Sequence, residues 1–186
     1  EQLEADPVHI DFIPSGEMLL VEENGLVRLG SWANDDFTES WNLDLNVTIN
    51  TAAVDSSGQF IAVGVNAGVI FVNIDIQNVS GSIETISPVQ SLAWDIDNDL
   101  WVGHHGGNQR KAVEYDTNGA SGTMTGISST SHGSALKAFA ILSDGRIATC
   151  GNDLEMKIHL PNGLVATEYT SLTNYPTQLI VDSNDR

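Results

Sequence analysis

An acidic turn between two apolar segments organises the stretch Leu92-Ala93-Trp94-Asp95-Ile96-Asp97-Asn98-Asp99-Leu100-Trp101-Val102-Gly103. The same arrangement occurs five times in all, with turns centred at residues 16, 58, 98, 145 and 185, which are 42, 40, 47 and 40 residues apart. Apolar residues stand six and four positions before every centre: Ile10 and Phe12, Ala52 and Val54, Leu92 and Trp94, Phe139 and Ile141, Leu179 and Val181. A period of this length indicates a repeat architecture.

Each repeat predicts four short β-strands. The strand before the turn has apolar residues at alternate positions, and short apolar strands follow the turn at 18–21, 60–63, 100–102 and 147–150. Third strands are predicted at 26–29, 69–72, 112–115 and 156–160, and a weaker fourth strand is clearest at 163–169. No segment sustains the period of 3.6 residues that marks a helix. Four-stranded units of this length are typical of β-propeller blades.

The sequence therefore predicts an all-β fold, a β-propeller of four-stranded antiparallel blades in a single domain over residues 1–186. Four complete blades are expected at roughly 8–46, 47–86, 87–133 and 134–174, and residues 175–186 begin a fifth with its first strand. A ring must close to protect its edge strands. Two solutions remain open: the chain is a fragment of a longer propeller, or two copies join head to tail in a homodimer that completes one ring.

The third repeat resembles a known type of propeller blade. Its segment Asp95–Gly103, followed by Glu114-Tyr115-Asp116, looks like a two-component-regulator-type or streptogramin-lyase-like propeller repeat, in which an acidic turn leads into a Leu-Trp-Val-Gly strand. The second repeat, Val54–Gly64, is similar to a WD40 strand pair. The Trp-Asp dipeptide of WD40 proteins is absent from the third strands. These resemblances imply the propeller fold and transfer no functional residue.

Composition narrows the classes of partner. Seven Lys and Arg against 25 Asp and Glu give a net charge of −18 over 186 residues, which argues against nucleic acid and against an anionic membrane surface. No apolar run reaches the length of a membrane-spanning helix, so membrane insertion is not expected. The single Cys150 excludes an internal disulfide. The acidity fits a secreted, periplasmic or cell-surface setting better than the cytoplasm.

Loops that join strands at one face of a propeller supply the candidate site residues. His104, His105 and His132 are expected there with Arg110. Three imidazoles on one rim would suit proton transfer or a divalent metal, and Arg110 could hold a carboxylate. Those four residues are the catalytic candidates, and the predicted ligand-binding set is Glu23, Asn66, His104, Arg110 and Asp153. The simpler interpretation is that they are solvated loop residues, because one sequence shows no convergent geometry.

Alternating aspartates in the third repeat offer a second candidate. Asp95, Asp97 and Asp99 could present carboxylates to Ca²⁺, but Leu100 and Gly106 stand where an EF-hand loop needs Gly and Glu. A structural turn is the favoured interpretation, because Asp is common in turns. No cofactor is predicted, although a divalent cation on the acidic surface stays open.

The sequence favours a non-enzymatic module that binds a protein or a small molecule, within a larger sensor or surface protein. The alternative is a propeller lyase or hydrolase with a histidine site at the channel mouth. Propellers host many unrelated activities, so the fold does not decide between them.

Overall fold

The computed structural model describes residue 3 and residues 5–106 and 110–181, and it contains sixteen strands in four antiparallel sheets. Blade 1 consists of β1 (Pro7–Phe12), β2 (Met18–Glu22), β3 (Leu26–Ala33) and β4 (Asp36–Asp44). Blade 2 consists of β5 (Ile49–Val54), β6 (Phe60–Val65), β7 (Gly68–Asn73) and β8 (Asn78–Glu84). Blade 3 consists of β9 (Val89–Trp94), β10 (Leu100–His104), β11 (Ala112–Thr117) and β12 (Gly122–Ser128). Blade 4 consists of β13 (Leu136–Ile141), β14 (Ile147–Gly151), β15 (Met156–His159) and β16 (Val165–Tyr169).

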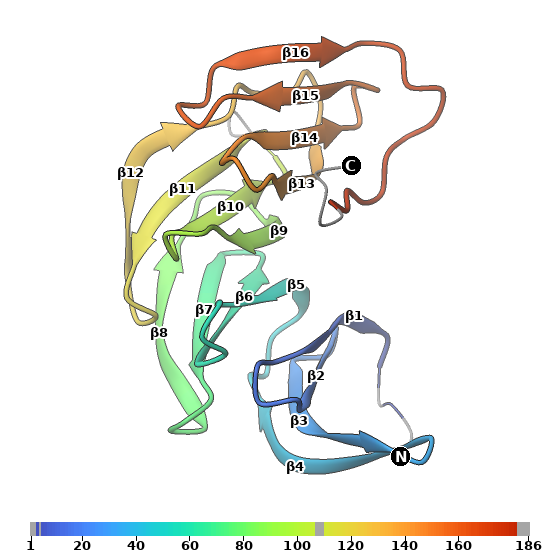
Figure 1. The fold of residues 1–186 in the computed structure, drawn as a ribbon, viewed down its shortest axis with the longest axis vertical. Coiled ribbons are helices and arrows are strands. Elements are labelled where there is room, and N and C mark those ends of the chain that lie inside the picture. The colour runs from blue at the N-terminus through green and yellow to red at the C-terminus, as the bar shows by residue number, and fades with distance from the viewer. Residues whose placement is uncertain (1–2, 4, 107–109, 182–186) are drawn as a thin grey trace.

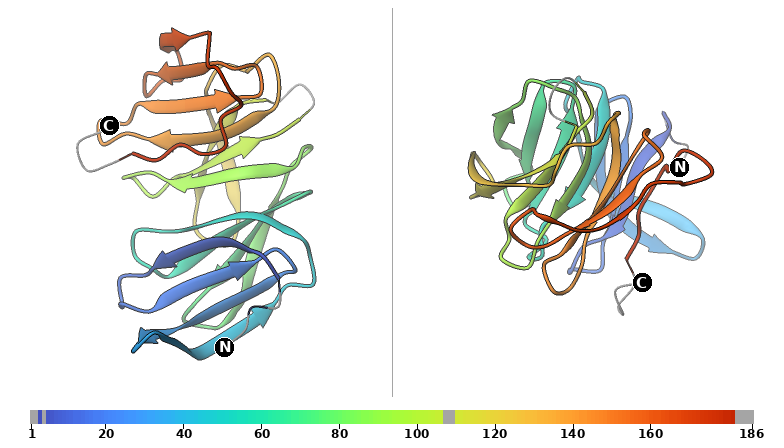
Figure 2. Two further views of the ribbon diagram at one scale, coloured as in Figure 1. Left: turned by 90° about the vertical axis from the view of Figure 1, so that its right-hand side faces the viewer. Right: turned by 90° about the horizontal axis from the view of Figure 1, so that it is seen from above.

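The four sheets stand side by side as blades in an arc that does not close (Figure 1). Strands within each blade are hydrogen-bonded in chain order, and the first strands β1, β5, β9 and β13 contact one another in succession along the inner side of the arc. Figure 2 looks into the open side and shows blades 1 and 4 at opposite ends. The predicted all-β propeller with four-stranded antiparallel blades is confirmed.

The predicted first strand of a fifth blade is not formed in the part that the structure describes. Residues 175–181 follow blade 4 without strand structure, and residues 182–186 lie outside the described ranges. A β-strand needs ladder hydrogen bonds from a neighbour, and residues 175–181 pair with no described strand. Among the described residues, none belongs to a helix long and apolar enough to cross a membrane.

The hydrophobic core lies between the blades rather than inside any one of them. Alternate residues of a strand point to opposite faces of its sheet, so each inner blade packs one face against each neighbour. Eleven buried apolar residues join blades 1 and 2, nine join blades 2 and 3, and five join blades 3 and 4. Leu100, which is fully buried, contributes to the cluster between blades 2 and 3 together with Phe71 and Tyr115.

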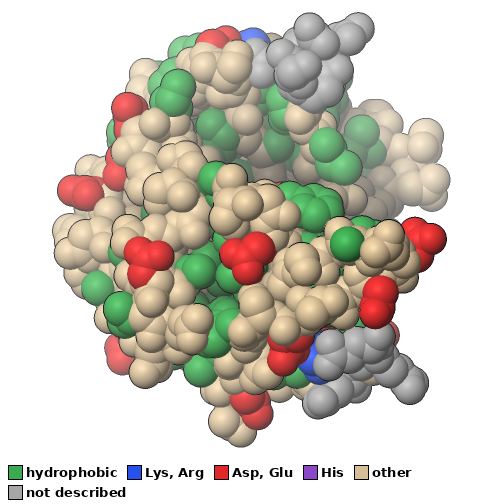
Figure 3. Space-filling model, turned by 60° about the horizontal axis from the view of Figure 1, so that its bottom comes forward, with side chains coloured by type: hydrophobic (Ala, Val, Ile, Leu, Met, Phe, Trp, Pro, Cys, Tyr) green, Lys and Arg blue, Asp and Glu red, His purple; other side chains and the backbone are tan. Residues whose placement is uncertain are grey.

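The outer face of blade 1 has the same apolar pattern, but no strand of the described residues packs against it. Ile10 and Phe12 lie directly opposite Leu20 and Met18, as Leu92 and Trp94 lie opposite Val102 and Leu100 in blade 3. In blade 3 these positions pack against blade 2, whereas Ile10 is 57% and Phe12 61% exposed. Apolar side chains reach the surface where the blade 1 end of the arc comes forward (Figure 3). This end face is therefore shaped for packing against another sheet.

Replacing Leu100 with Ala tests the interblade core. We expect the free energy of unfolding to fall by about 2–5 kcal/mol, because a fully buried leucine leaves a cavity behind. Ile96→Ala is the matched control, since this side chain lies four residues away and is 88% exposed; its change should stay within about 0.5 kcal/mol. Urea denaturation measures both values, and equal losses in the two variants would contradict this placement of the core.

Candidate functional site

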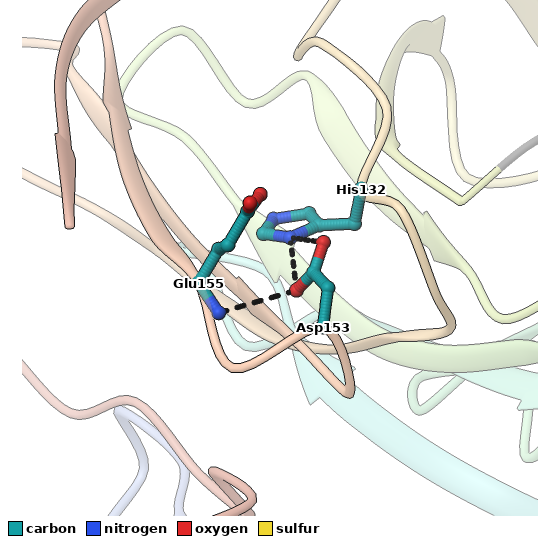
Figure 4. A group of neighbouring side chains, drawn as sticks. All are labelled: His132, Asp153 and Glu155. Atoms are coloured by element: carbon teal, nitrogen blue, oxygen red, sulfur yellow. Dashed lines mark hydrogen bonds and ion pairs between the residues drawn. The ribbon is translucent and has the colours of Figure 1, made fainter. Parts of the chain in front are cut away.

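His132, in the connection from blade 3 to blade 4, is buried at the centre of a hydrogen-bond network. Its Nδ1 lies 3.0 Å from both carboxylate oxygens of Asp153, and its Nε2 lies 2.9 Å from Oγ1 of Thr149. Asp153 also accepts the backbone N–H of Gly133 at 2.6 Å and that of Glu155 at 3.3 Å. Figure 4 shows His132 and Asp153 facing each other, with Glu155 beside them. The imidazole thus fixes the connection to the second strand of blade 4 and to the turn that follows this strand.

Thr149 extends this network to the third strand of the blade. Its Oγ1 lies 3.0 Å from Nε2 of His159, which is fully buried. A threonine hydroxyl has one proton, so it donates to one imidazole and accepts from the other. Gly151 is required beside the pair, because a Cβ there would lie 2.8 Å from Nδ1 of His132. We refer to His132, Thr149, Asp153 and His159 below as the blade 4 network.

Sequence reasoning missed Thr149 and His159. Thr149 lies opposite Phe139, a position that blades 1 to 3 fill with Leu20, Val63 and Val102. The signal was a polar side chain at a position that is apolar in every other blade.

The blade 4 network stabilises the fold through hydrogen bonds and is a weak candidate for a metal centre. His132, Asp153 and Glu155 each offer an atom within 4.8 Å of the others, a spacing that could hold an ion. However, Glu155 is paired with the ammonium group of Lys157 at 3.0 Å. Lys157 also pairs with Glu168 at 3.2 Å and donates to the carbonyl of Ser131 at 3.3 Å. Lys157 therefore already supplies, at Glu155, the positive charge that a metal ion would bring.

The two other histidines predicted for the site, His104 and His105, do not join His132. His104 is fully buried, and its Nδ1 lies 3.3 Å from Oγ of Ser87, so it fixes the connection that enters blade 3. Burial lowers the pKa of His104 to about 4, and nearby Lys111 adds to the effect. His105 is half-buried beside it. Within the described part of the chain, neither residue belongs to a group of three or more His, Cys, Asp or Glu side chains within metal-ligand distance.

The remaining predicted site residues are spread over the loops. Arg110 donates to the carbonyl of Gly133 at 2.7 Å, so it braces the backbone next to His132. Glu23 is exposed in blade 1, and Asn66 in blade 2 accepts a hydrogen bond from Asn50 at 3.1 Å. Of the predicted ligand-binding set, Arg110 and Asp153 are thus brought to the same connection, and Glu23 and Asn66 lie on other blades.

The aspartate run in the third repeat forms the turn that the sequence favoured. Oδ1 of Asp95 accepts the backbone N–H groups of Asp97 at 3.0 Å and Asp99 at 2.9 Å, and its Oδ2 accepts Nε1 of Trp101 at 3.1 Å. Asn98 takes a positive φ of 67° at the turn centre. Asp95 is therefore the residue that holds the turn.

A groove of about 490 Å³ opens beside this turn, between blades 3 and 4. Other neighbouring blades have their turns in contact at this face: a Cβ on Gly58 would lie 2.5 Å from the ring of Pro14 between blades 1 and 2, and Ser56 donates to Asn98 at 3.4 Å between blades 2 and 3. The groove is lined by Trp94, Asp95, Ile96, Asp97, Trp101, Glu114, Ile141, Leu142, Ser143, Gly145, Pro161 and Val181. Its walls are therefore largely apolar, with carboxylates at one end.

Three carboxylates converge at the acidic end of the groove. Asp95, Asp99 and Glu114 each offer an oxygen within 4.8 Å of the others. Burial raises the pKa of Asp99, and the neighbouring carboxylates of Asp95 and Glu114 raise it further. Glu114 was not among the predicted site residues, because it comes from the third strand and reaches the turn only through its pairing with Trp101.

Lowering the pH should weaken the fold through its buried histidines. Because the pKa of His104 is about 4 in the folded chain and near its ordinary 6.5 when unfolded, the unfolded chain binds the proton first. Stability is therefore lost as the pH falls from 7.5 to 5.5, by about 1 kcal/mol for this residue. Urea denaturation at both pH values should show a smaller loss for His104→Asn than for the unmodified chain. Leu100→Ala, the control, should keep the original difference. Identical differences for His104→Asn and the unmodified chain would contradict the argument.

Comparison with known proteins finds similar structures, whereas comparison of the sequence finds no match among family models or curated proteins. Among solved structures, the fold is similar to the β-propeller domain of Cps50 (Swd1) from Myceliophteria thermophila, with a TM-score of 0.80 and 10% sequence identity. The match covers all of this chain and 62% of that one.

The comparison supports the fold and leaves the activity open. The chain spans about 62% of the length of the propeller it matches, and at 10% identity no residue role is transferred. As 1223 chains of solved structures match, the architecture is widespread and does not select a function by itself. The chain has a β-propeller fold.

Proposed function

We propose that this chain is a non-enzymatic binding module that holds a segment of another protein in the groove between blades 3 and 4. The observation that carries the proposal is the groove itself, about 490 Å³ in volume, whose largely apolar lining also includes the carboxylates of Asp95, Asp97 and Glu114. The similarity to a WD40 propeller supports a protein as the partner. Small molecules are the weaker alternative, because the groove is an open trough between two turns.

A histidine-based lyase or hydrolase has less support. Its candidates would be His104, His105, His132 and Arg110 at the channel mouth. Acid–base catalysis requires an imidazole within reach of the substrate, but His104 and His132 are buried and bonded to Ser87, Asp153 and Thr149. Arg110 is bonded to the backbone of Gly133. These side chains hold the loops in place.

Selection from a phage-displayed peptide library tests the binding function. We expect selected peptides to bind the unmodified chain and to lose at least tenfold in affinity for Ile96→Asp, because this side chain lies at the groove and is 88% exposed. Ile86→Asp is the matched control: Ile86 is 85% exposed but does not line the groove. Isothermal titration calorimetry measures both affinities. Failure to select any peptide, or equal effects of the two substitutions, would argue against the proposal.

We also propose that a second copy of the chain packs on the end face of blade 1 in a homodimer. This face continues the pattern of the interblade contacts, with Ile10 and Phe12 at positions that are packed in blade 3. Its cation Arg28 is paired with Glu22 and Glu39, each at 2.8 Å, so no unpaired arginine opposes burial of the face.

Light scattering tests the homodimer. The unmodified chain should show twice its 19.9 kDa mass, and the double substitution Ile10→Glu, Phe12→Glu should return it to a monomer, since two charges cannot be buried in an apolar contact. Ile86→Glu should leave the mass unchanged. A monomer at every protein concentration would contradict the homodimer and leave the groove proposal unaffected.

A further inference from the structure

The groove between blades 3 and 4 carries charge of one sign. Asp95, Asp97 and Glu114 line it, and no Lys, Arg or His is among the described residues of its lining. Asp99 lies directly behind them, within 4.8 Å of Asp95 and Glu114. A negative potential therefore adds to the general field of a chain whose net charge is −18. Any partner that enters must either bring positive charge or leave these carboxylates uncompensated.

The carboxylates are fixed in place before any partner arrives. The two oxygens of Asp95 accept the backbone N–H groups of Asp97 and Asp99 and the indole N–H of Trp101. Glu114 accepts the hydroxyl of Thr125 at 2.5 Å. Asp97 is exposed at the rim. The acidic end thus combines two hydrogen-bonded carboxylates with one that is exposed to solvent.

The apolar walls distinguish this groove from a metal site. Calcium takes six to eight oxygen ligands around one point, whereas this cluster has three carboxylates, of which Asp95 and Glu114 line a groove that continues along Ile96, Ile141 and Pro161. A long aliphatic side chain with a cationic head fits both parts, because its methylene groups cover apolar surface while its head stays at the acidic end. Lysine and arginine have this form.

We propose that the groove selects a protein segment in which an arginine or lysine stands next to an aliphatic residue. The cationic head lies at Asp97 and Glu114, and the aliphatic neighbour packs on Ile96 and Ile141. This inference rests on the proposed function and specifies the partner's chemistry. Opposite charge at the rim of an interface also accelerates association at low salt.

Nuclear magnetic resonance of the four indole N–H groups provides the test. The indole N–H of Trp101 is bonded to Asp95 beneath the groove, whereas Trp32 and Trp41 belong to blade 1. We would titrate the protein with acetyl-Ala-Leu-Arg-Ile-Ala-amide and with the same peptide carrying neutral citrulline for arginine. The arginine peptide should shift the Trp101 signal, leave Trp32 and Trp41 in place, and bind about tenfold more tightly than the citrulline peptide.

Two charge-neutralising substitutions complete the design. Asp97→Asn should weaken the arginine peptide about threefold to tenfold and leave the citrulline peptide unaffected. Asp75→Asn, the control, removes the same charge from an exposed turn of blade 2 outside the groove, and both peptides should bind this variant as they bind the unmodified chain.

The possible failures are distinguishable. Equal affinity for the two peptides, or no Trp101 shift with the arginine peptide up to about 10 mM, would overturn the charge selection, while peptides from the phage selection could still bind and uphold the proposed function. If 1 mM CaCl₂ alone shifts Trp101 and blocks the arginine peptide, the acidic end is an ion site and the inference is wrong. If the phage selection also yields nothing, the proposed function fails with it.

Discussion

Packing of one sheet face against the next is the interaction on which the rest of this structure depends. Each blade is a four-stranded sheet with apolar residues on both faces, and a sheet of that kind gains its stability only when neighbours cover it. The three interblade clusters provide this cover along the arc. The end face of blade 1, with Ile10 and Phe12 exposed, shows the same pattern with no described strand packed on it.

The last of these interfaces is also the least apolar. Five buried apolar residues join blades 3 and 4, against eleven between blades 1 and 2. Thr149 and His159 occupy part of the blade 4 face that would otherwise be apolar, and His132 ties them to the connection between the blades. Hydrogen bonds are directional and local, so they fix the connection from blade 3 onto blade 4 at one edge of the interface. The opposite edge, at the turns, contains the groove.

Repetition explains how much of this could be predicted from the sequence. The turn centred at Asn98 and its apolar neighbours recur at a fixed period, and that period was sufficient to predict the blades and the order of their strands. The position of Glu114 beside the Asp95 turn could not be predicted from the sequence, because it depends on the register between Glu114 and Trp101 in neighbouring strands. His132 was assigned to the correct loop, but its burial depends on hydrogen bonds to Thr149 and Asp153, which lie 17 and 21 positions away.

The histidines and aspartates lie in environments that their chemistry alone did not suggest. Imidazoles titrate near neutral pH and invite catalytic hypotheses, yet here burial lowers the pKa of His104 and of His159 to about 4 and commits both rings to the fold. The aspartates looked like turn residues, and Asp95 is one, but the turn that it holds also presents Asp97 to solvent beside an apolar groove. In a repeat protein the residues of a turn can differ from one repeat to the next, because the packing of the strands on both sides of the turn maintains the fold.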